Sequence, residues 1–173
     1  WCCLVGSEMC IRDRFLWDQT VRCANKGLTL NETINVIKLP RQFSDHYTTQ
    51  QLYGLVEHHV RQIYTGLFGW FDEDEANLFP VPLPERSQRL VEGFGGKARV
   101  REIIDASLTK NDFRWAIELS SWLVRGNFND LGIADAGELE DRNRLASALR
   151  GVAYTTSAAN IRNWCITLSL IHI

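Results

Sequence analysis

Two adjacent histidines, His58 and His59, have the clearest capacity for chemistry in this sequence. An imidazole can bind a metal ion, exchange a proton near neutral pH or donate a hydrogen bond to an anion. Both lie in Tyr53–Asp72, where the spacing of apolar residues is typical of a helix that runs into a Gly-Trp-Phe-Asp turn. Because successive helical residues diverge by about 100°, the two imidazoles cannot readily chelate one ion together.

The helical spacing predicts different surroundings for the two histidines. His59 falls on the apolar face, which predicts a packed and hydrogen-bonded core histidine. His58 falls on the opposite face, where it could face a site or simply be solvated. Tyr64, at a second apolar edge, is predicted to be a core residue. The apolar face consists of Leu52, Leu55, Val56, His59, Ile63 and Leu67.

No other residues form a recognisable catalytic set. The histidines, His46 included, lack the His-x-His-x-Asp-His and His-Glu-x-x-His spacings of zinc hydrolases, so we expect no metal site and no catalytic residue in this segment. Glu73–Glu75 is most simply a solvated acidic run. Cys23 and Cys165 are far apart and predict neither a disulfide framework nor a zinc knuckle. Gly93–Gly96 lacks the lysine and the preceding strand of a phosphate loop, and predicts a helix cap instead.

Composition indicates a folded globular protein. The 173 residues are 45% hydrophobic and 23% charged, with a net charge of −2 and both signs interspersed. Without a basic stripe, nucleic acid is not expected as a partner. No apolar run approaches the roughly 20 residues that a membrane span needs.

Both ends of the chain resemble translated sequencing-adapter sequence, over Gly6–Arg14 and Thr167–Ile173. Neither end has a cap, a turn signal or a sustained period. We therefore expect residues 1–13 and 168–173 to be non-native tails around a domain that spans 14–167. A genuine short strand at each end is the alternative.

Every element that the sequence predicts is a helix, so the predicted fold class is all-α. Thr29–Glu32 fits a capping box that opens a helix with Ile34 and Ile37 facing inward, and Thr48–Gln51 offers another for the helix of the two histidines. Phe113–Val124 is apolar on two sides, which predicts the middle of a stack. The helical hairpins after residue 97 resemble tetratricopeptide-like pairs. Other predictions are helices over 15–25, 85–92, 100–108, 139–149 and 157–165, a polar loop over 126–132, and an exposed charged face at Glu138, Glu140, Arg142 and Arg144.

The segment Phe79–Pro84 has three prolines in five residues, which disfavours helix and predicts an extended arm. It marks a sub-boundary near residues 73–84. Trp70, Phe71 and Phe79 beside it argue for an arm that is packed down. This surplus of aromatic residues, together with the long apolar helix face, favours a buried association surface. Dimerisation is the leading inference.

Several motifs in order along the chain resemble the linear alkyl sulfatases of the metallo-β-lactamase superfamily. The resemblance covers roughly Arg14–Thr167 and lies in Asp18-Gln19-Thr20, Ala24-Asn25, Gly27, Tyr53-Gly54, His58, the Arg61 and Tyr64 pair, Gly69-Trp70-Phe71-Asp72, Ala76-Asn77-Leu78, Pro80-x-Pro82, Asp112-Phe113-Arg114-Trp115-Ala116 and Arg162-Asn163-Trp164.

This resemblance implies that the chain is the α-helical dimerisation domain of a larger, homodimeric zinc hydrolase. Two zinc ions would lie in an N-terminal metallo-β-lactamase-like domain of the parent chain, with all their ligands upstream, so that this segment binds no zinc. The parent would hydrolyse sulfate esters with a metal-activated water.

The resemblance also implies a role for His58. A histidine followed by asparagine in this helix of the family reaches toward the sulfate of the substrate, and His58 occupies that position. The neighbours Glu57 and His59 depart from the family pattern, which leaves a related ester hydrolase open. A helical-repeat protein-binding module, with a groove on the hairpins after residue 97 and no catalytic role, is the alternative function.

Overall fold

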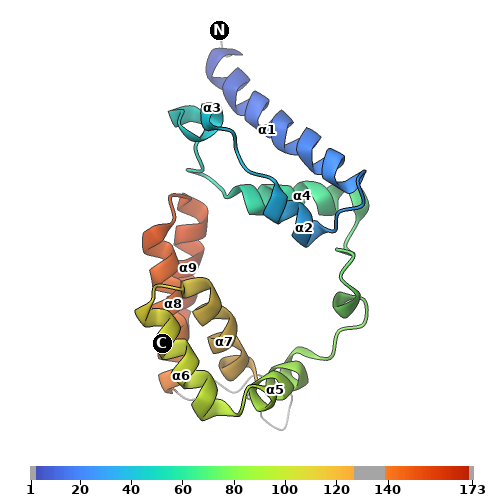
Figure 1. Cartoon of the computed structure of the whole chain (residues 1–173). Coiled ribbons are helices and arrows are strands. Elements are labelled where there is room, and N and C mark those ends of the chain that lie inside the picture. Colours follow the sequence, from blue (N-terminus) through green and yellow to red (C-terminus); the bar gives the residue numbers. More distant parts are fainter. Residues whose placement is uncertain (1–2, 127–138, 172–173) are drawn as a thin grey trace. The chain divides into compact units, whose positions relative to one another are not determined.

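A computed structural model describes residues 3–126 and 139–171 of the chain, with side chains described over 10–126 and 139–170 (Figure 1). Within these residues every element is helical, which confirms the predicted all-α class. Two short 3-10 helices, η1 (Tyr47–Thr49) and η2 (Glu75–Asn77), accompany the α-helices. The latter are α1 (Cys3–Ala24), α2 (Leu30–Val36), α3 (Arg41–Ser44), α4 (Val56–Phe68), α5 (Leu83–Gly93), α6 (Lys97–Thr109), α7 (Phe113–Arg125), α8 (Leu139–Thr155) and α9 (Ala159–Ile171).

The chain forms two compact units. Three late residues belong to unit 1 through hydrogen bonds to the segment before α4. The Ser157 hydroxyl donates to the Gln51 carbonyl at 2.9 Å, and the Ala159 N–H donates to the Leu52 carbonyl at 2.8 Å. Unit 1 therefore comprises Trp1–Phe79 and Ser157–Ala159, and unit 2 comprises Pro80–Thr156 and Asn160–Ile173.

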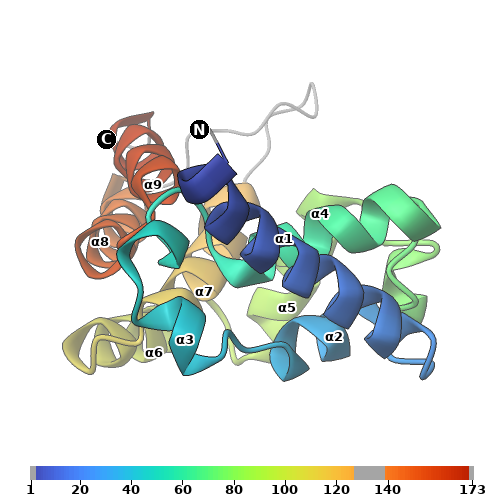
Figure 2. The same cartoon turned by 90° about the horizontal axis from the view of Figure 1, so that it is seen from above.

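The core of unit 1 lies where α1, α2 and α4 meet (Figure 2). Leu16 and Cys23 from α1 are buried against Val60 from α4 and Ile37 at the end of α2. Burial of Leu16, Cys23 and Ile37 confirms the inward faces that the sequence predicts for these two helices.

The predicted capping box is present at the start of α2. The Glu32 N–H donates to Thr29 Oγ1 at 3.3 Å, and the Thr29 N–H donates to Glu32 Oε2 at 2.9 Å. These bonds satisfy N–H groups that have no partner within the helix. The bonds that the Glu32 carboxylate accepts from the Thr29 N–H and the Thr29 hydroxyl lower the pKa of this carboxyl below its ordinary value.

Helix α1 begins twelve residues before the predicted start at Phe15, so residues 3–13 are helical. Residues 168–171 are likewise part of α9. The alternative of a strand at each end is wrong for the described residues; residues 1–2 and 172–173 lie outside them. Arg12 is buried and donates to the Gln50 carbonyl at 3.4 Å, so tertiary packing supports a helix that has no capping signal of its own.

Helix α4 begins later than the sequence predicts. The expected capping box does not form, because the Thr48 hydroxyl hydrogen-bonds instead to His46 Nδ1 at 2.9 Å, within the turn around η1. The Gln51 side-chain oxygen accepts from the Val56 N–H at 2.8 Å and takes over part of the capping role.

The buried stripe of α4 also differs from the predicted apolar face. Val60 and Tyr64 are its buried residues, which confirms Tyr64 as a core residue, whereas Leu67 is exposed. Val56 and Ile63 pack beside Val60. The stripe is thus centred on Val60, one residue along from His59, and His59 lies at its edge.

Helix α7 is the centre of unit 2 and packs against α5, α6 and α8, which confirms its predicted position in the middle of a stack. On one side, Leu119 and Leu123 are buried with Ile104 of α6. On the other, Val124 is buried with Leu149 of α8. Two apolar faces are needed because each is covered by a different helix.

The ends of α5 combine one confirmed prediction with one correction. Gly93–Gly96 caps the helix as predicted: Gly95 and Gly96 have φ of 95° and 89°, and the Gly96 N–H donates to the Val91 carbonyl at 2.9 Å. Pro84, however, lies inside the first turn of α5, where a missing N–H costs nothing, so the extended arm is shorter than 79–84. Apart from Gly126, the polar loop predicted over 126–132 lies outside the described residues.

A buried carboxylate joins α6 to α8 in unit 2. Asp141 is fully buried, and Arg101 donates to its two oxygens at 2.8 and 2.7 Å. Arg144 lies 3.5 Å from Asp141 and donates to Asp105 at 2.9 Å, and this bond to Asp105 raises the pKa of Arg144. The predicted exposed face of α8 is therefore wrong for Arg142 and Arg144, which are both partly buried, and Glu138 lies outside the described residues.

Replacing Asp141 should destabilise unit 2. In Asp141→Ala we expect the free energy of unfolding to fall by about 3 kcal/mol, since breaking a buried pair leaves its partner uncompensated. We expect a loss at the low end of the values typical of broken buried ion pairs, because Arg101 is 24% exposed and water can partly solvate its charge. Urea denaturation measures the change. Glu102→Ala, which removes only the exposed pair with Arg99, should change stability by less than about 0.5 kcal/mol. Equal losses in the two variants would contradict a structural role for Asp141.

Candidate functional site

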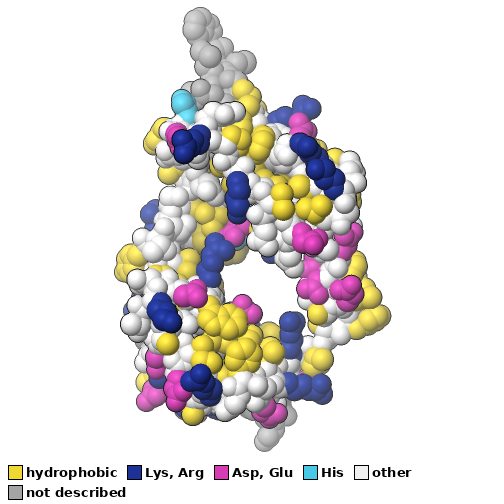
Figure 3. All heavy atoms as spheres, viewed as in Figure 1, with side chains coloured by type: hydrophobic (Ala, Val, Ile, Leu, Met, Phe, Trp, Pro, Cys, Tyr) yellow, Lys and Arg dark blue, Asp and Glu magenta, His cyan; other side chains and the backbone are white. Residues whose placement is uncertain are grey.

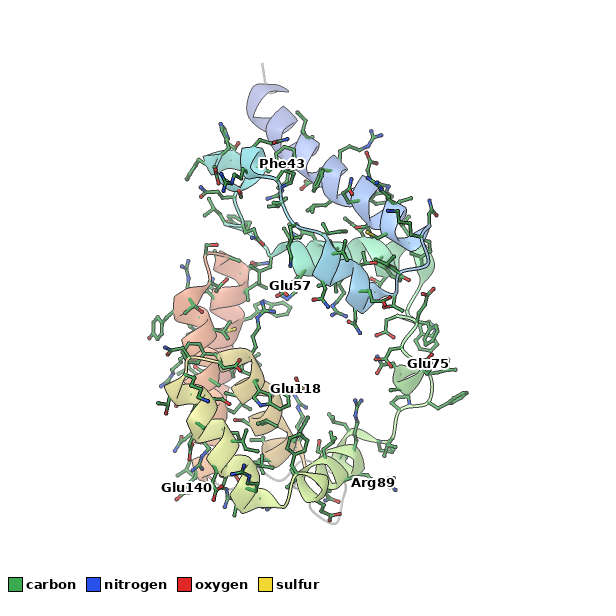
Figure 4. The ribbon with its side chains drawn as sticks, viewed as in Figure 1. Phe43, Glu57, Glu75, Arg89, Glu118 and Glu140 are labelled. Carbon is green, nitrogen blue, oxygen red and sulfur yellow. The ribbon has the colours of Figure 1, made fainter. Side chains whose placement is uncertain are left out.

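Helix α4 directs its two histidines to different surroundings, as the spacing predicts. His58 is exposed, and its Nε2 lies 3.7 Å from the carboxylate of Glu57, the residue of α4 that Figure 4 labels. Its position on the solvent side of α4 leaves the imidazole accessible to a ligand.

His59 is half-buried, so its assignment to the core is only partly right. It lies over Gly54: a Cβ added there would be 2.5 Å from His59 Nε2, so only glycine leaves room for this ring. Burial, followed by the nearby Arg12 charge, lowers the pKa of His59 below its ordinary value. A positive charge on this ring is disfavoured, and the neutral imidazole is the form that packs here.

A pocket of about 500 Å³ opens beside His59 in unit 1. Arg12 and Asp13 form an ion pair of 2.9 Å at its wall, so opposite charges there largely offset each other. The pocket has no strong electrostatic preference for an anion. It is lined by Arg12, Asp13, Leu16, Trp17, Tyr53, His59, Gln62 and Ile63.

The Gly-Trp-Phe-Asp turn after α4 is held by hydrogen bonds to Asp72. The Asp72 carboxylate accepts from the Asn77 side chain at 2.8 Å and from the Asp74 N–H at 3.2 Å. Its carbonyl accepts from the Leu30 N–H at 3.3 Å. Gly69, with φ of 91°, ends the helix in a conformation that other residues rarely adopt. Within the described structure these motif residues shape the backbone.

Glu73 is placed by this turn against the buried Tyr64. Its φ of 65° is unusual for a residue with a side chain, and its carboxylate hydrogen-bonds the Tyr64 hydroxyl. Burial raises the pKa of Tyr64, and the negative charge of Glu73 raises it further. Tyr64 therefore stays a neutral core phenol, and the predicted solvated acidic run is partly structural.

Within residues 10–126 and 139–170, no group of three or more His, Cys, Asp or Glu side chains could hold a metal ion. These residues consequently do not fit a zinc centre. Cys23 and Cys165 are buried free thiols, and burial raises the pKa of Cys165, which disfavours the reactive thiolate.

Sequence reasoning missed the pocket because its walls come from distant segments. Arg12 and Trp17 lie on α1, Tyr53 precedes α4, and Gln62 lies on the polar side of α4. None belongs to a spaced motif. The only available signal was Gly54, whose missing side chain makes the room that His59 occupies.

The described residues thus form an all-helical segment in which no cluster of side chains could hold a metal ion. The alkyl sulfatase dimerisation family matches residues 29–170. This match covers most of the chain, and the chain belongs to that family. The family resemblance seen in the sequence is thereby confirmed.

The relatives named below are much longer than this chain. It is 37% identical over 152 residues to a linear primary-alkylsulfatase of Pseudomonas sp. (strain ATCC 19151), covering 87% of this chain and 27% of the relative. It is 33% identical over 154 residues to an (R)-specific secondary-alkylsulfatase of Pseudomonas sp., covering 88% of this chain and 22% of the relative. A solved structure of a double mutant of the sec-alkyl sulfatase PisA1 superposes with a TM-score of 0.84 at 30% identity, over 96% of this chain and 25% of that one. The chain thus spans about a quarter of these relatives.

Among the described helices, none combines the length and the apolar character needed to cross a lipid bilayer.

The lowered pKa of His59 predicts a pH-dependent contribution to stability. The unfolded chain binds a proton at His59 below about pH 6.5, more readily than the folded chain does. The contribution is therefore complete above that pH and is lost as the pH falls toward the folded-state pKa. Urea unfolding from about pH 5 to about pH 7.5 should show this decrease in wild type and in the control His58→Gln, but less of it in His59→Gln. Parallel curves for all three proteins would contradict the assignment.

Proposed function

We propose that this chain is the dimerisation part of a homodimeric, zinc-dependent hydrolase of sulfate esters, resembling the alkylsulfatases. The family match over residues 29–170 is the observation that supports this most strongly. The relatives named as primary and secondary alkylsulfatases support the substrate class. Because the chain spans about a quarter of those relatives, the catalytic centre would belong to the rest of the parent protein.

Zinc would be bound by an N-terminal metallo-β-lactamase-like domain outside this chain. The described residues do not fit the metal, so no step of the reaction is assigned to a metal held here. Residues 14–167 would be the native domain, with a sub-boundary near 73–84, and residues 1–13 and 168–173 would be added tails.

His58 would supply one group that faces the sulfate of the substrate. Three features support this: its side chain is exposed, it lies away from the buried stripe of α4, and its ring can donate a hydrogen bond. In the structure, Nε2 of His58 lies 3.7 Å from the Glu57 carboxylate, whose negative charge would repel a sulfate placed beside it. In the complete enzyme a sulfate oxygen would replace Glu57 as the partner of Nε2. Binding would then depend on how far Glu57 turns away.

A helical-repeat protein-binding module is the second candidate. Helices α6 and α7, and α8 and α9, would be its tetratricopeptide-like hairpins. A mostly apolar pocket of about 250 Å³ within unit 2, lined in part by Trp122 and Leu123 of α7, favours it.

Substitution of His58 tests the substrate-facing role in the complete enzyme. We expect His58→Ala to lower kcat/KM for an alkyl sulfate by about 10- to 100-fold, because a hydrogen bond to a charged group contributes about 1.5–3 kcal/mol. Zinc content should be unchanged. His46→Ala, at another exposed histidine of unit 1, is the matched control and should retain activity. Wild-type turnover in His58→Ala would remove His58 from the site.

The coding sequence upstream of Phe15 separates the two candidate functions. We expect it to encode a His-x-His-x-Asp-His motif, whose spacing supplies the ligands of a zinc hydrolase. Sequencing the parent gene reads this directly. An upstream region without such a motif would favour the binding module.

A further inference from the structure

Unit 1 exposes large apolar side chains along the segment that follows α4. Trp70 is 73% exposed and Phe79 is 89% exposed, although their position beside the prolines predicted an arm that is packed down. Figure 3 shows hydrophobic side chains next to acidic ones along this edge. We call this set the aromatic arm, which consists of Leu67, Phe68, Trp70, Leu78 and Phe79.

Two rings of the aromatic arm, those of Phe68 and Trp70, pack against neighbouring rings. The Phe68 ring centroid is 4.9 Å from that of the buried Tyr64, and the Trp70 centroid is 5.6 Å from that of Phe71. The backbone turn that follows Trp70 and Phe71 is fixed by the hydrogen bonds that the Asp72 carboxylate accepts from Asp74 and Asn77. Ordered aromatic side chains lose little further entropy on binding, which is typical of interface hot spots.

The exposed area is large enough to contribute to a stable interface. Aromatic side chains bury about 150–250 Å² each. With exposures of 50%, 73% and 89%, Phe68, Trp70 and Phe79 together offer about 400 Å². A standard interface buries about 800 Å² per partner, and monomers rarely expose an apolar patch beyond a few hundred Å². These three side chains would supply about half of one partner's share.

We propose that the aromatic arm is a contact surface for a second copy of this chain. The inference rests on the proposed homodimer and names the surface that forms it. A second copy is favoured over another partner because the family that matches residues 29–170 is defined by dimerisation. The adjacent acidic run of residues 72–75 would lie at the rim, since like charges from two copies repel at the centre.

Sedimentation equilibrium of the 173-residue chain tests this surface. Wild type should be a dimer, and the double variant Trp70→Ser/Phe79→Ser should raise the dimer dissociation constant by at least about 30-fold, as loss of a hot spot does. The matched control is Tyr154→Ser/Trp164→Ser, which removes exposed aromatic rings of unit 2 (82% and 71% exposed) and should dimerise like wild type. Far-UV circular dichroism checks that all three proteins have the same helical content.

The possible results separate this inference from the proposed function. A wild-type dimer that survives the Trp70 and Phe79 substitutions overturns the aromatic arm as the interface and leaves the homodimer intact. Equal weakening by the unit 2 control also overturns it. A wild-type monomer at high concentration overturns both the inference and self-association of this chain, and indicates that another part of the parent covers the arm. Selective weakening by the arm variant supports the proposal.

Discussion

Burial of Val60 and Tyr64 is the constraint on which unit 1 depends. Helix α4 can bury only the stripe that faces α1 and α2, so these two residues determine where every other side chain of α4 points. His58 is consequently on the solvent side, and His59 lies at the edge of the stripe rather than within it. A helix that rotated by one residue would exchange these positions, and with them the histidine available to a ligand.

The turn after α4 is fastened to this core and fixes the exposed segment that follows it. Asp72 ties the chain back to Leu30 and to Asn77, and Glu73 reaches the buried Tyr64. The residues of the family motif Gly69-Trp70-Phe71-Asp72 therefore have two different structural roles. Gly69 and Asp72 shape the backbone, whereas Trp70 projects outward from it. This motif, one of those that carry the family resemblance, here holds the backbone from which Trp70 of the proposed contact surface projects.

Unit 2 uses a different arrangement, in which a central apolar helix is combined with a buried ion-pair network. Helix α7 brings α5, α6 and α8 together through apolar contacts that lack direction. The Arg101–Asp141 pair between α6 and α8 is directional. Its two parallel hydrogen bonds to one carboxylate fix how these two helices align with each other. The described residues hold no cluster of side chains that could bind a metal ion, and the chain belongs to the alkyl sulfatase dimerisation family.

Local patterns in the sequence determined the helical class, the capping box at Thr29, the glycine cap after α5, the two-sided burial of α7 and the family. Each depends on residues close together in the chain, where spacing alone specifies the contact. Tertiary structure decided what distant residues do to one another. It moved the start of the predicted helix to Val56 by giving the Thr48 hydroxyl another partner, buried Asp141 by bringing Arg101 to it, and left Trp70 and Phe79 exposed. Burial depends on which surfaces meet, and no local period specifies that.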